Sequence, residues 1–162
     1  MDDLWYAEAL TLSYAEASLS QDPSTQLGAV LLSPERLIIG VGNNHFPRGT
    51  SDDFWHGPKE AKYERVAHAE LSAILDASKK GFSTRGSTLV CPWASCSNCA
   101  KYMVEAGVST LVRHIETDPH SAWTDSIAVG DEIMRSGGVH IIEVPGIPTD
   151  IRLRRGGKPW TW

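Results

Sequence analysis

Two short stretches of the sequence contain residue types that bind a metal ion and use it in catalysis. They are His68-Ala69-Glu70 and Cys96-Ser97-Asn98-Cys99, and each begins a predicted helix. Two cysteines three positions apart at a helix start can direct both sulfur atoms to one ion, and a histidine from a second helix start completes three protein ligands. A catalytic zinc site keeps a fourth position for water, whereas structural sites are closed by four protein ligands. The pattern therefore predicts a catalytic Zn²⁺ site at His68, Cys96 and Cys99.

Glu70 stands two residues after the predicted histidine ligand, on the same helical turn. Its carboxylate can carry a proton between a water molecule and a substrate without binding the metal. Because a zinc ion lowers the pKa of a bound water from 15.7 to about 7, the two features together predict a hydrolytic reaction with Glu70 as the catalytic acid and base. A non-catalytic zinc module used for binding or assembly remains the alternative, but it has no need of such a carboxylate.

The cysteines also have simpler interpretations. A CxxC pair alone is typical of a redox dithiol near a strand–helix junction, although such a protein would not need His68. Cys91 is expected to be a buried core thiol, because using it in place of Cys96 breaks the close spacing to Cys99. A total of three cysteines excludes a closed disulfide framework and favours a reducing compartment.

Length, composition and charge indicate one globular cytoplasmic domain. The chain has 162 residues, of which 41% are apolar and 22% charged, so a disordered or collagen-like chain is excluded. The first residues lack the basic and apolar regions of a signal peptide, and no apolar run approaches the roughly 20 residues needed to cross a bilayer. A net charge of −5 disfavours a polynucleotide partner, which usually selects a basic surface, and favours a small molecule.

The spacing of apolar residues predicts the elements that must position these motifs. Helices are expected at residues 4–19, 68–80, 97–106 and 124–135, with part of 59–66 also helical. Strands are expected at residues 28–33, 36–41, 87–91, 108–114 and 139–144. The long segment between residues 42 and 67 should be a functional loop. This order predicts an α/β sandwich in which helices cover a mixed sheet whose last strands are parallel.

The C-terminal residues 146–162 are expected to form a basic, Trp-containing extension of the domain formed by residues 1–145. Residues 151–162 include three arginines and a lysine, contain no acidic residue, and end in Pro159-Trp160-Thr161-Trp162. They could contact a nucleic acid, a nucleotide phosphate or a protein partner. The simpler interpretation is a tail docked on their own domain or on a neighbouring subunit.

The motifs resemble those of the cytidine deaminase superfamily, and most closely those of deoxycytidylate (dCMP) deaminases. His-x-Glu followed by Pro-Cys-x-x-Cys is the signature of zinc-dependent deaminases, with Ser95 here in place of the proline. Residues 20–29 (SQDPSTQLGA) and 42–49 (GNNHFPRG), and Ser51-Asp52-Asp53 after them, also resemble segments of that family. The resemblance covers about residues 4–144. Asn43, His45 and residues 92–95 depart from the family pattern near the expected base pocket.

The resemblance implies a fold, a reaction and an assembly. The fold is a three-layer α/β/α sandwich with a mixed five-stranded sheet, and the reaction is zinc-dependent deamination of dCMP to dUMP and ammonia. The alternatives are deaminases of 5-substituted dCMP, a free nucleoside, guanine or tRNA adenosine. The resemblance also implies a homo-oligomer, a hexamer in many members, and dCTP and dTTP as effectors.

The same resemblance implies four substrate-binding residues. Asn44 should contact the sugar or base, since an amide both donates and accepts, unless it serves only the turn. Arg48 is a candidate phosphate or effector ligand or a surface charge. Thr25, beside Gln26, either contacts the substrate or caps the backbone. Trp93 either stacks on the base, as aromatic rings do at about 1–3 kcal/mol, or packs in the core. His45 and His56 are expected to be solvated loop residues.

Overall fold

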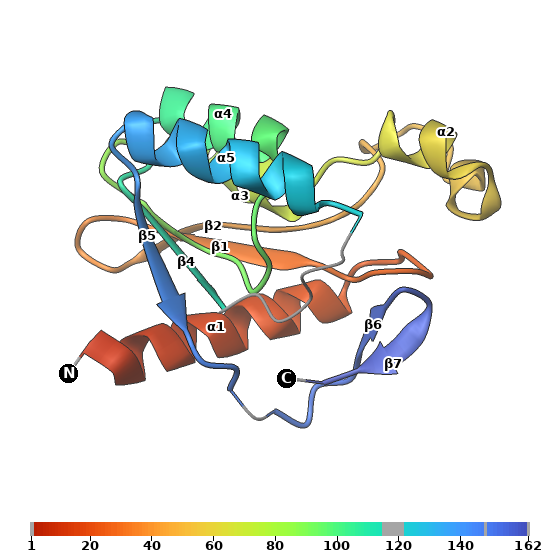
Figure 1. Cartoon of the computed structure of the whole chain (residues 1–162), viewed down its shortest axis with the longest axis horizontal. Coiled ribbons are helices and arrows are strands. Elements are labelled where there is room, and N and C mark those ends of the chain that lie inside the picture. Colours follow the sequence, from red (N-terminus) through yellow and green to blue (C-terminus); the bar gives the residue numbers. More distant parts are fainter. Residues whose placement is uncertain (1, 115–121, 148, 162) are drawn as a thin grey trace.

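The computed structural model describes residues 2–114, 122–147 and 149–161, and its centre is a mixed five-stranded sheet (Figure 1). The strand order is β2-β1-β3-β4-β5. The strands are β1 (Gly28–Leu32), β2 (Ile38–Asn43), β3 (Thr88–Val90), β4 (Thr110–His114) and β5 (His140–Val144). β1 is antiparallel to both β2 and β3, whereas β3, β4 and β5 are parallel. The predicted strands and the parallel arrangement of the last ones are confirmed.

Helices cover both faces of this sheet. α1 (Asp2–Ser18) lies on one face, and α3 (Ala69–Lys79), α4 (Ser97–Glu105) and α5 (Thr124–Ser136) lie on the other. The three-layer α/β/α sandwich with a mixed sheet is therefore confirmed. None of the helices in the described part of the chain is long and apolar enough to span a membrane.

The interior strand β1, between β2 and β3, separates two apolar cores. Alternate side chains of a strand point to opposite faces, so Val30 and Leu32 pack with α1 residues such as Leu10 and Tyr14. Leu31, on the other face, packs in the core under α3, α4 and α5. All five residues of β1 are buried, as expected for a strand covered on both faces.

Gly42 on β2 brings α3 close to the sheet. A Cβ at this position would lie 2.7 Å from the carbonyl oxygen of Ala69 and would also overlap the backbone at Ala73. Only a residue without a side chain allows this approach. Because Ala69 begins α3, the glycine also fixes the height of the adjacent His68 and Glu70 above the sheet.

Two peripheral segments complete the structure. Between β2 and α3 the chain forms an irregular loop with a 3₁₀ turn, η1 (Asp53–His56), and a short helix, α2 (Lys59–Tyr63), so the expected helix at 59–66 is present but shorter. After β5 the chain forms a separate hairpin of β6 (Leu153–Arg155) and β7 (Lys158–Trp160). The sequence analysis did not predict this hairpin.

Candidate metal centre and pocket

The predicted metal ligands come together at the starts of two helices. His68 precedes α3 and Cys96 precedes α4, both in extended backbone conformations, and Cys99 lies in the first turn of α4. A residue three positions into a helix faces the same side as the residue before its start, so the two sulfur atoms face one point. Since α3 and α4 pack on the same face of the sheet, that point lies beside His68.

The distances among these atoms fit a tetrahedral zinc ion. Nδ1 of His68 lies 3.5 Å from Sγ of Cys96 and 3.4 Å from Sγ of Cys99. Zinc–nitrogen and zinc–sulfur bonds of about 2.05 and 2.3 Å at a tetrahedral angle place nitrogen and sulfur about 3.6 Å apart. All three ligand atoms lie within 4.8 Å of one another. Among the described residues, this is the one cluster of three or more His, Cys, Asp or Glu side chains that could hold a metal ion.

The electrostatics of this cluster favour a thiolate. The pKa of Cys96 is lowered to about 4, because the Cys99 side chain and His68 donate hydrogen bonds to its sulfur. The interaction with Cys96 in turn raises the pKa of His68. A thiolate is the form of cysteine that binds zinc, and His68 would have to give up the proton that this interaction favours in order to bind the ion as a neutral imidazole. Cys91, by contrast, lies in the apolar core, where burial raises the pKa of its thiol; this agrees with a structural role.

Glu70 lies in the first turn of α3 and lines the same pocket as His68 and Cys96. It is 2% exposed, and its Oε2 atom has no hydrogen-bond partner among the described residues. Buried carboxylate oxygens are normally hydrogen-bonded. An unpartnered oxygen beside a metal-ligand cluster is therefore suited to exchange a proton with a bound molecule.

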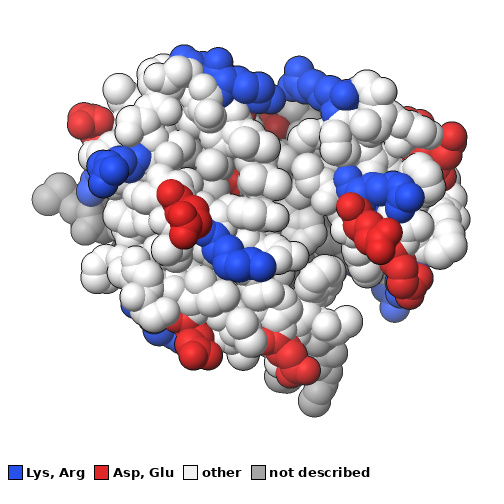
Figure 2. Space-filling view, turned by 90° about the horizontal axis from the view of Figure 1, so that it is seen from above, with Lys and Arg blue, Asp and Glu red and all other residues white. Residues whose placement is uncertain are grey.

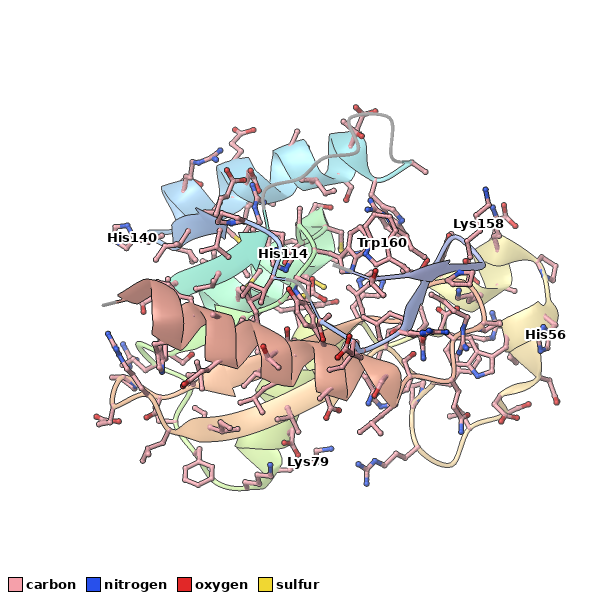
Figure 3. The ribbon with its side chains drawn as sticks, turned by 90° about the horizontal axis from the view of Figure 1, so that it is seen from below. His56, Lys79, His114, His140, Lys158 and Trp160 are labelled. Carbon is pink, nitrogen blue, oxygen red and sulfur yellow. The ribbon has the colours of Figure 1, made fainter. Side chains whose placement is uncertain are left out.

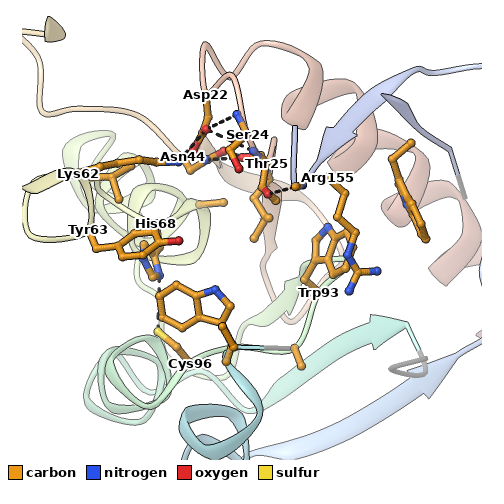
Figure 4. Close-up of a pocket in the computed structure, with 18 of the residues that line it drawn as sticks. Asp22, Ser24, Thr25, Asn44, Lys62, Tyr63, His68, Trp93, Cys96 and Arg155 are labelled. Atoms are coloured by element: carbon orange, nitrogen blue, oxygen red, sulfur yellow. Dashed lines mark hydrogen bonds and ion pairs between the residues drawn. The ribbon is translucent and has the colours of Figure 1, made fainter. Parts of the chain in front are cut away.

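The pocket has a volume of about 950 Å³ (Figure 4). The metal-ligand cluster and Glu70 lie at one end, where Trp123 packs edge-on against His68 and Tyr63. The hairpin of β6 and β7 supplies another part of the wall, including Arg155, Lys158 and Trp160. The cavity is thus lined by segments far apart in the sequence.

The structure brings three of the four expected substrate-binding residues to this pocket. Thr25, Asn44 and Trp93 line it. Arg48 does not; it lines a second, smaller cavity of about 310 Å³ together with His45 and Trp55. The loop that carries Arg48 leads away from the metal ligands before the chain returns through α2. Arg48 is therefore outside the pocket, although it is close to Asn44 in the sequence.

The side chain of Asn44 is largely engaged by the protein itself. Its Nδ2 donates to Oδ2 of Asp22 at 3.0 Å and to the Thr25 carbonyl at 2.8 Å, and its Oδ1 accepts from the Leu27 amide at 2.7 Å. With these three hydrogen bonds Asn44 shapes the pocket wall, and one lone pair of its Oδ1 atom is left for a ligand. Asn44 is also not in the left-handed conformation that a turn residue often adopts.

A buried ion pair that the sequence analysis missed supports the same wall. Lys62 of α2 lies 2.7 Å from Oδ2 of Asp22, and both side chains are nearly inaccessible to solvent. Asp22 also accepts hydrogen bonds from the amides of Ser24 and Thr25. The available signal was the sequence Asp22-Pro23-Ser24, in which an aspartate can bond to the following amides and form a turn.

Comparisons of the sequence with known proteins point to the same kind of zinc site. The family model "Cytidine and deoxycytidylate deaminase zinc-binding region" matches residues 3–115. The mouse deoxycytidylate deaminase is 33% identical over 114 residues, which are 67% of this chain and 63% of the mouse protein. An uncharacterized deaminase of Aliivibrio fischeri, encoded in the luxG 3′ region, is 33% identical over 148 residues, 91% of this chain and 96% of the relative.

The solved structures show the same fold. The apo structure of dCMP deaminase from the cyanophage S-TIM5 superposes with a TM-score of 0.68 at 22% identity and covers 89% of this chain and all of that one. This chain spans about 63% of the length of the mouse relative. His68, Glu70, Cys96 and Cys99 all lie within the matched region, and the chain belongs to the cytidine and deoxycytidylate deaminase family.

Proposed function

We propose that the protein is a zinc-dependent deaminase of a cytosine nucleotide, which converts dCMP to dUMP and ammonia. The observation that carries the proposal is the meeting of three ligand atoms and the unpartnered Glu70 carboxylate at one end of a pocket large enough for a nucleotide. The names of the curated relatives support the nucleotide substrate.

In this proposal the metal ligands and Glu70 have separate roles. His68, Cys96 and Cys99 would hold Zn²⁺, which when bound makes a water molecule acidic near neutral pH. Glu70 accepts a proton from that water and delivers it to N3 of the cytosine ring, which makes C4 electrophilic. The oxygen of the deprotonated water would then add to C4, and the same carboxylate would take the second proton from this oxygen and pass it to the amino group. The C4–N bond breaks, ammonia leaves, and the oxygen remains on C4 as the carbonyl of uracil. Its buried, unpartnered Oε2 is available for both transfers.

The pocket walls would orient the nucleotide. Thr25 and Asn44 lie on the wall that the Asp22–Lys62 ion pair stabilises, where one acceptor position of Asn44 can bind a sugar hydroxyl. The aromatic faces of Trp93 and Trp123 offer stacking surfaces for a base. Arg48 has no part in this proposal, because it lines the other cavity. A homo-oligomer and regulation by dCTP and dTTP stay predictions of the family resemblance, and a cytoplasmic location stays a prediction of the composition.

An ammonia-release screen of the zinc-loaded protein tests the proposal. The panel contains cytosine, cytidine, dCMP, 5-substituted dCMP, and adenine and guanine compounds. We expect the highest kcat/KM for dCMP. Stoichiometric zinc without ammonia release from any of these compounds would favour the non-catalytic zinc module, and a preference for a purine compound would replace the proposed substrate.

A further inference from the structure

The β6–β7 hairpin forms part of the pocket wall, although it lies outside residues 3–115, which the family model matches. Its turn is Gly156-Gly157, and both glycines have positive φ angles, of 59° and 78°. Two such residues form the tight turn that suits a two-residue hairpin. The hairpin is therefore a defined element of the pocket wall that lies outside the matched residues.

Hydrogen bonds fix the hairpin to the adjacent segment of the pocket wall, residues 24–26. The amide of Gln26 donates to the Arg154 carbonyl at 3.0 Å, and the amide of Gly157 donates to the Ser24 carbonyl at 2.8 Å. The amide of Gly156 also donates to Oγ1 of Thr25 at 3.1 Å. Since the segment around Thr25 is held in turn by Asp22, the hairpin is positioned relative to the catalytic end.

The cationic side chains that line the pocket come from α2 and from the hairpin. Lys62 is neutralised by Asp22 in a buried ion pair. The other Lys and Arg residues that line the pocket, Arg155 and Lys158, both come from the hairpin. The acidic residues of the described lining are Asp22 and Glu70, one of which is already paired with Lys62. The hairpin thus brings positive charge to one wall of a protein whose net charge is −5.

Stacking holds one of these cations in place. The guanidinium carbon of Arg155 lies 3.5 Å from the ring centroid of Trp93 and 5.0 Å from that of Trp160. Figure 4 shows Arg155 over Trp93, and Figure 3 shows Trp160 and Lys158 on the hairpin. Such contacts restrict a guanidinium group, whose planar donors match phosphate oxygens. Trp93 is three residues from Cys96, so their Cα atoms lie within about 11 Å of each other.

We propose that the β6–β7 hairpin is a phosphate subsite, in which Arg155 and Lys158 bind the 5′-phosphate of the nucleotide. This inference rests on the proposed function, and it makes the hairpin the element that selects a nucleotide over the corresponding nucleoside. A mononucleotide fits better than a polynucleotide, because the net charge of the chain is −5 and a polynucleotide usually selects a basic surface. Figure 2 shows basic and acidic side chains interspersed on the face that it draws.

The test compares binding of dUMP, deoxyuridine and inorganic phosphate by isothermal titration calorimetry, and turnover of dCMP and deoxycytidine. The variants are Lys158→Gln, Arg155→Gln and Arg155→Lys. Arg152→Gln is the matched control, because Arg152 is an exposed arginine just before the hairpin that does not line the pocket. Exposed Lys158 can be replaced without disturbing the core, so the test does not depend on the stacked arginine.

We expect Lys158→Gln and Arg155→Gln each to weaken dUMP binding and dCMP kcat/KM by about 10- to 100-fold, the usual loss of a charge-assisted hydrogen bond. Values for deoxyuridine and deoxycytidine, and all values for Arg152→Gln, should stay unchanged. Arg155→Lys should recover part of the loss. An equal fall for nucleotide and nucleoside would overturn the subsite in favour of a structural hairpin, as would no change in either.

Two further outcomes separate this inference from the proposed function. If wild-type protein binds phosphate and the glutamine variants do not, while no cytosine compound is deaminated, the subsite stands and the substrate assignment fails. If dCMP is deaminated with an unchanged preference over deoxycytidine in every variant, the function stands and the subsite fails. Tighter binding of a single-stranded oligodeoxycytidylate than of dCMP, lost in the same variants, would overturn the mononucleotide ligand.

Discussion

The substitution Glu70→Gln tests the chemical core of the proposal. It preserves the shape of the side chain but removes the group that accepts and returns the proton. Positioned acid–base groups contribute about 10²- to 10⁴-fold to rates, so kcat for dCMP should fall by that factor, or about 3–5 kcal/mol in activation free energy. The zinc content should stay at one ion per chain, because Glu70 is outside the His68, Cys96 and Cys99 cluster.

The structure also predicts the effect of this substitution on stability. Glu70 is buried, and its Oε2 has no partner in the described part of the chain. A buried polar group without a hydrogen bond costs about 1–3 kcal/mol. Because the glutamine amide puts another polar atom at the same position, the substitution should change the free energy of unfolding of the metal-free protein by less than about 1–3 kcal/mol.

The assay combines ammonia release, zinc analysis by mass spectrometry and urea unfolding of the metal-free protein. Glu105→Gln, at the exposed end of α4, is the matched control and should retain wild-type turnover. Near-wild-type kcat for Glu70→Gln with zinc bound would refute the acid–base role. A loss of turnover together with loss of zinc would show instead that Glu70 holds the metal site.

Four other outcomes are expected. Cys99→Ser should lose zinc and dCMP turnover together, whereas Cys91→Ala should retain stoichiometric zinc by mass spectrometry. If Cys99→Ser kept the zinc and Cys91→Ala lost it, Cys91 and not Cys99 would be the ligand. Asp22→Asn should lower the urea-unfolding free energy by about 3–5 kcal/mol, because it leaves the buried Lys62 charge unpaired, and an unchanged midpoint would contradict the buried ion pair. Gly42→Ala should cost about 1–3 kcal/mol through overlap with α3, while Gly57→Ala, whose added Cβ would come no closer than 3.6 Å, should not. Burial lowers the pKa of His114 below its usual 6.5, so as the pH falls below that value the unfolded state binds a proton that the folded state excludes, and stability should fall. His114→Gln should flatten that slope in urea titrations, whereas the exposed His140→Gln should leave it unchanged.

Local sequence was enough to predict the metal ligands and most of the fold. Ligand spacing within one helix turn is a short-range property, so Cys96 and Cys99 were recognisable without a structure. Apolar periodicity likewise predicted α1, α3, α4, α5 and the five strands, because each of these elements buries a regular face. The antiparallel hairpin of β6 and β7 lacked such a face; only Gly156-Gly157 marked it.

The tertiary structure decided what the pocket contains. Sequence alone pointed to His68, Glu70, Cys96 and Cys99 as the candidates for the chemistry, since their types and spacing suffice for that prediction. It placed Arg48 beside Asn44 and left the C-terminal residues unassigned, whereas the folded chain moves Arg48 to another cavity and brings Arg155 onto Trp93. The physical reason is that a pocket wall is built from contacts between distant segments, and burial, stacking and backbone hydrogen bonds select these only after the chain has folded.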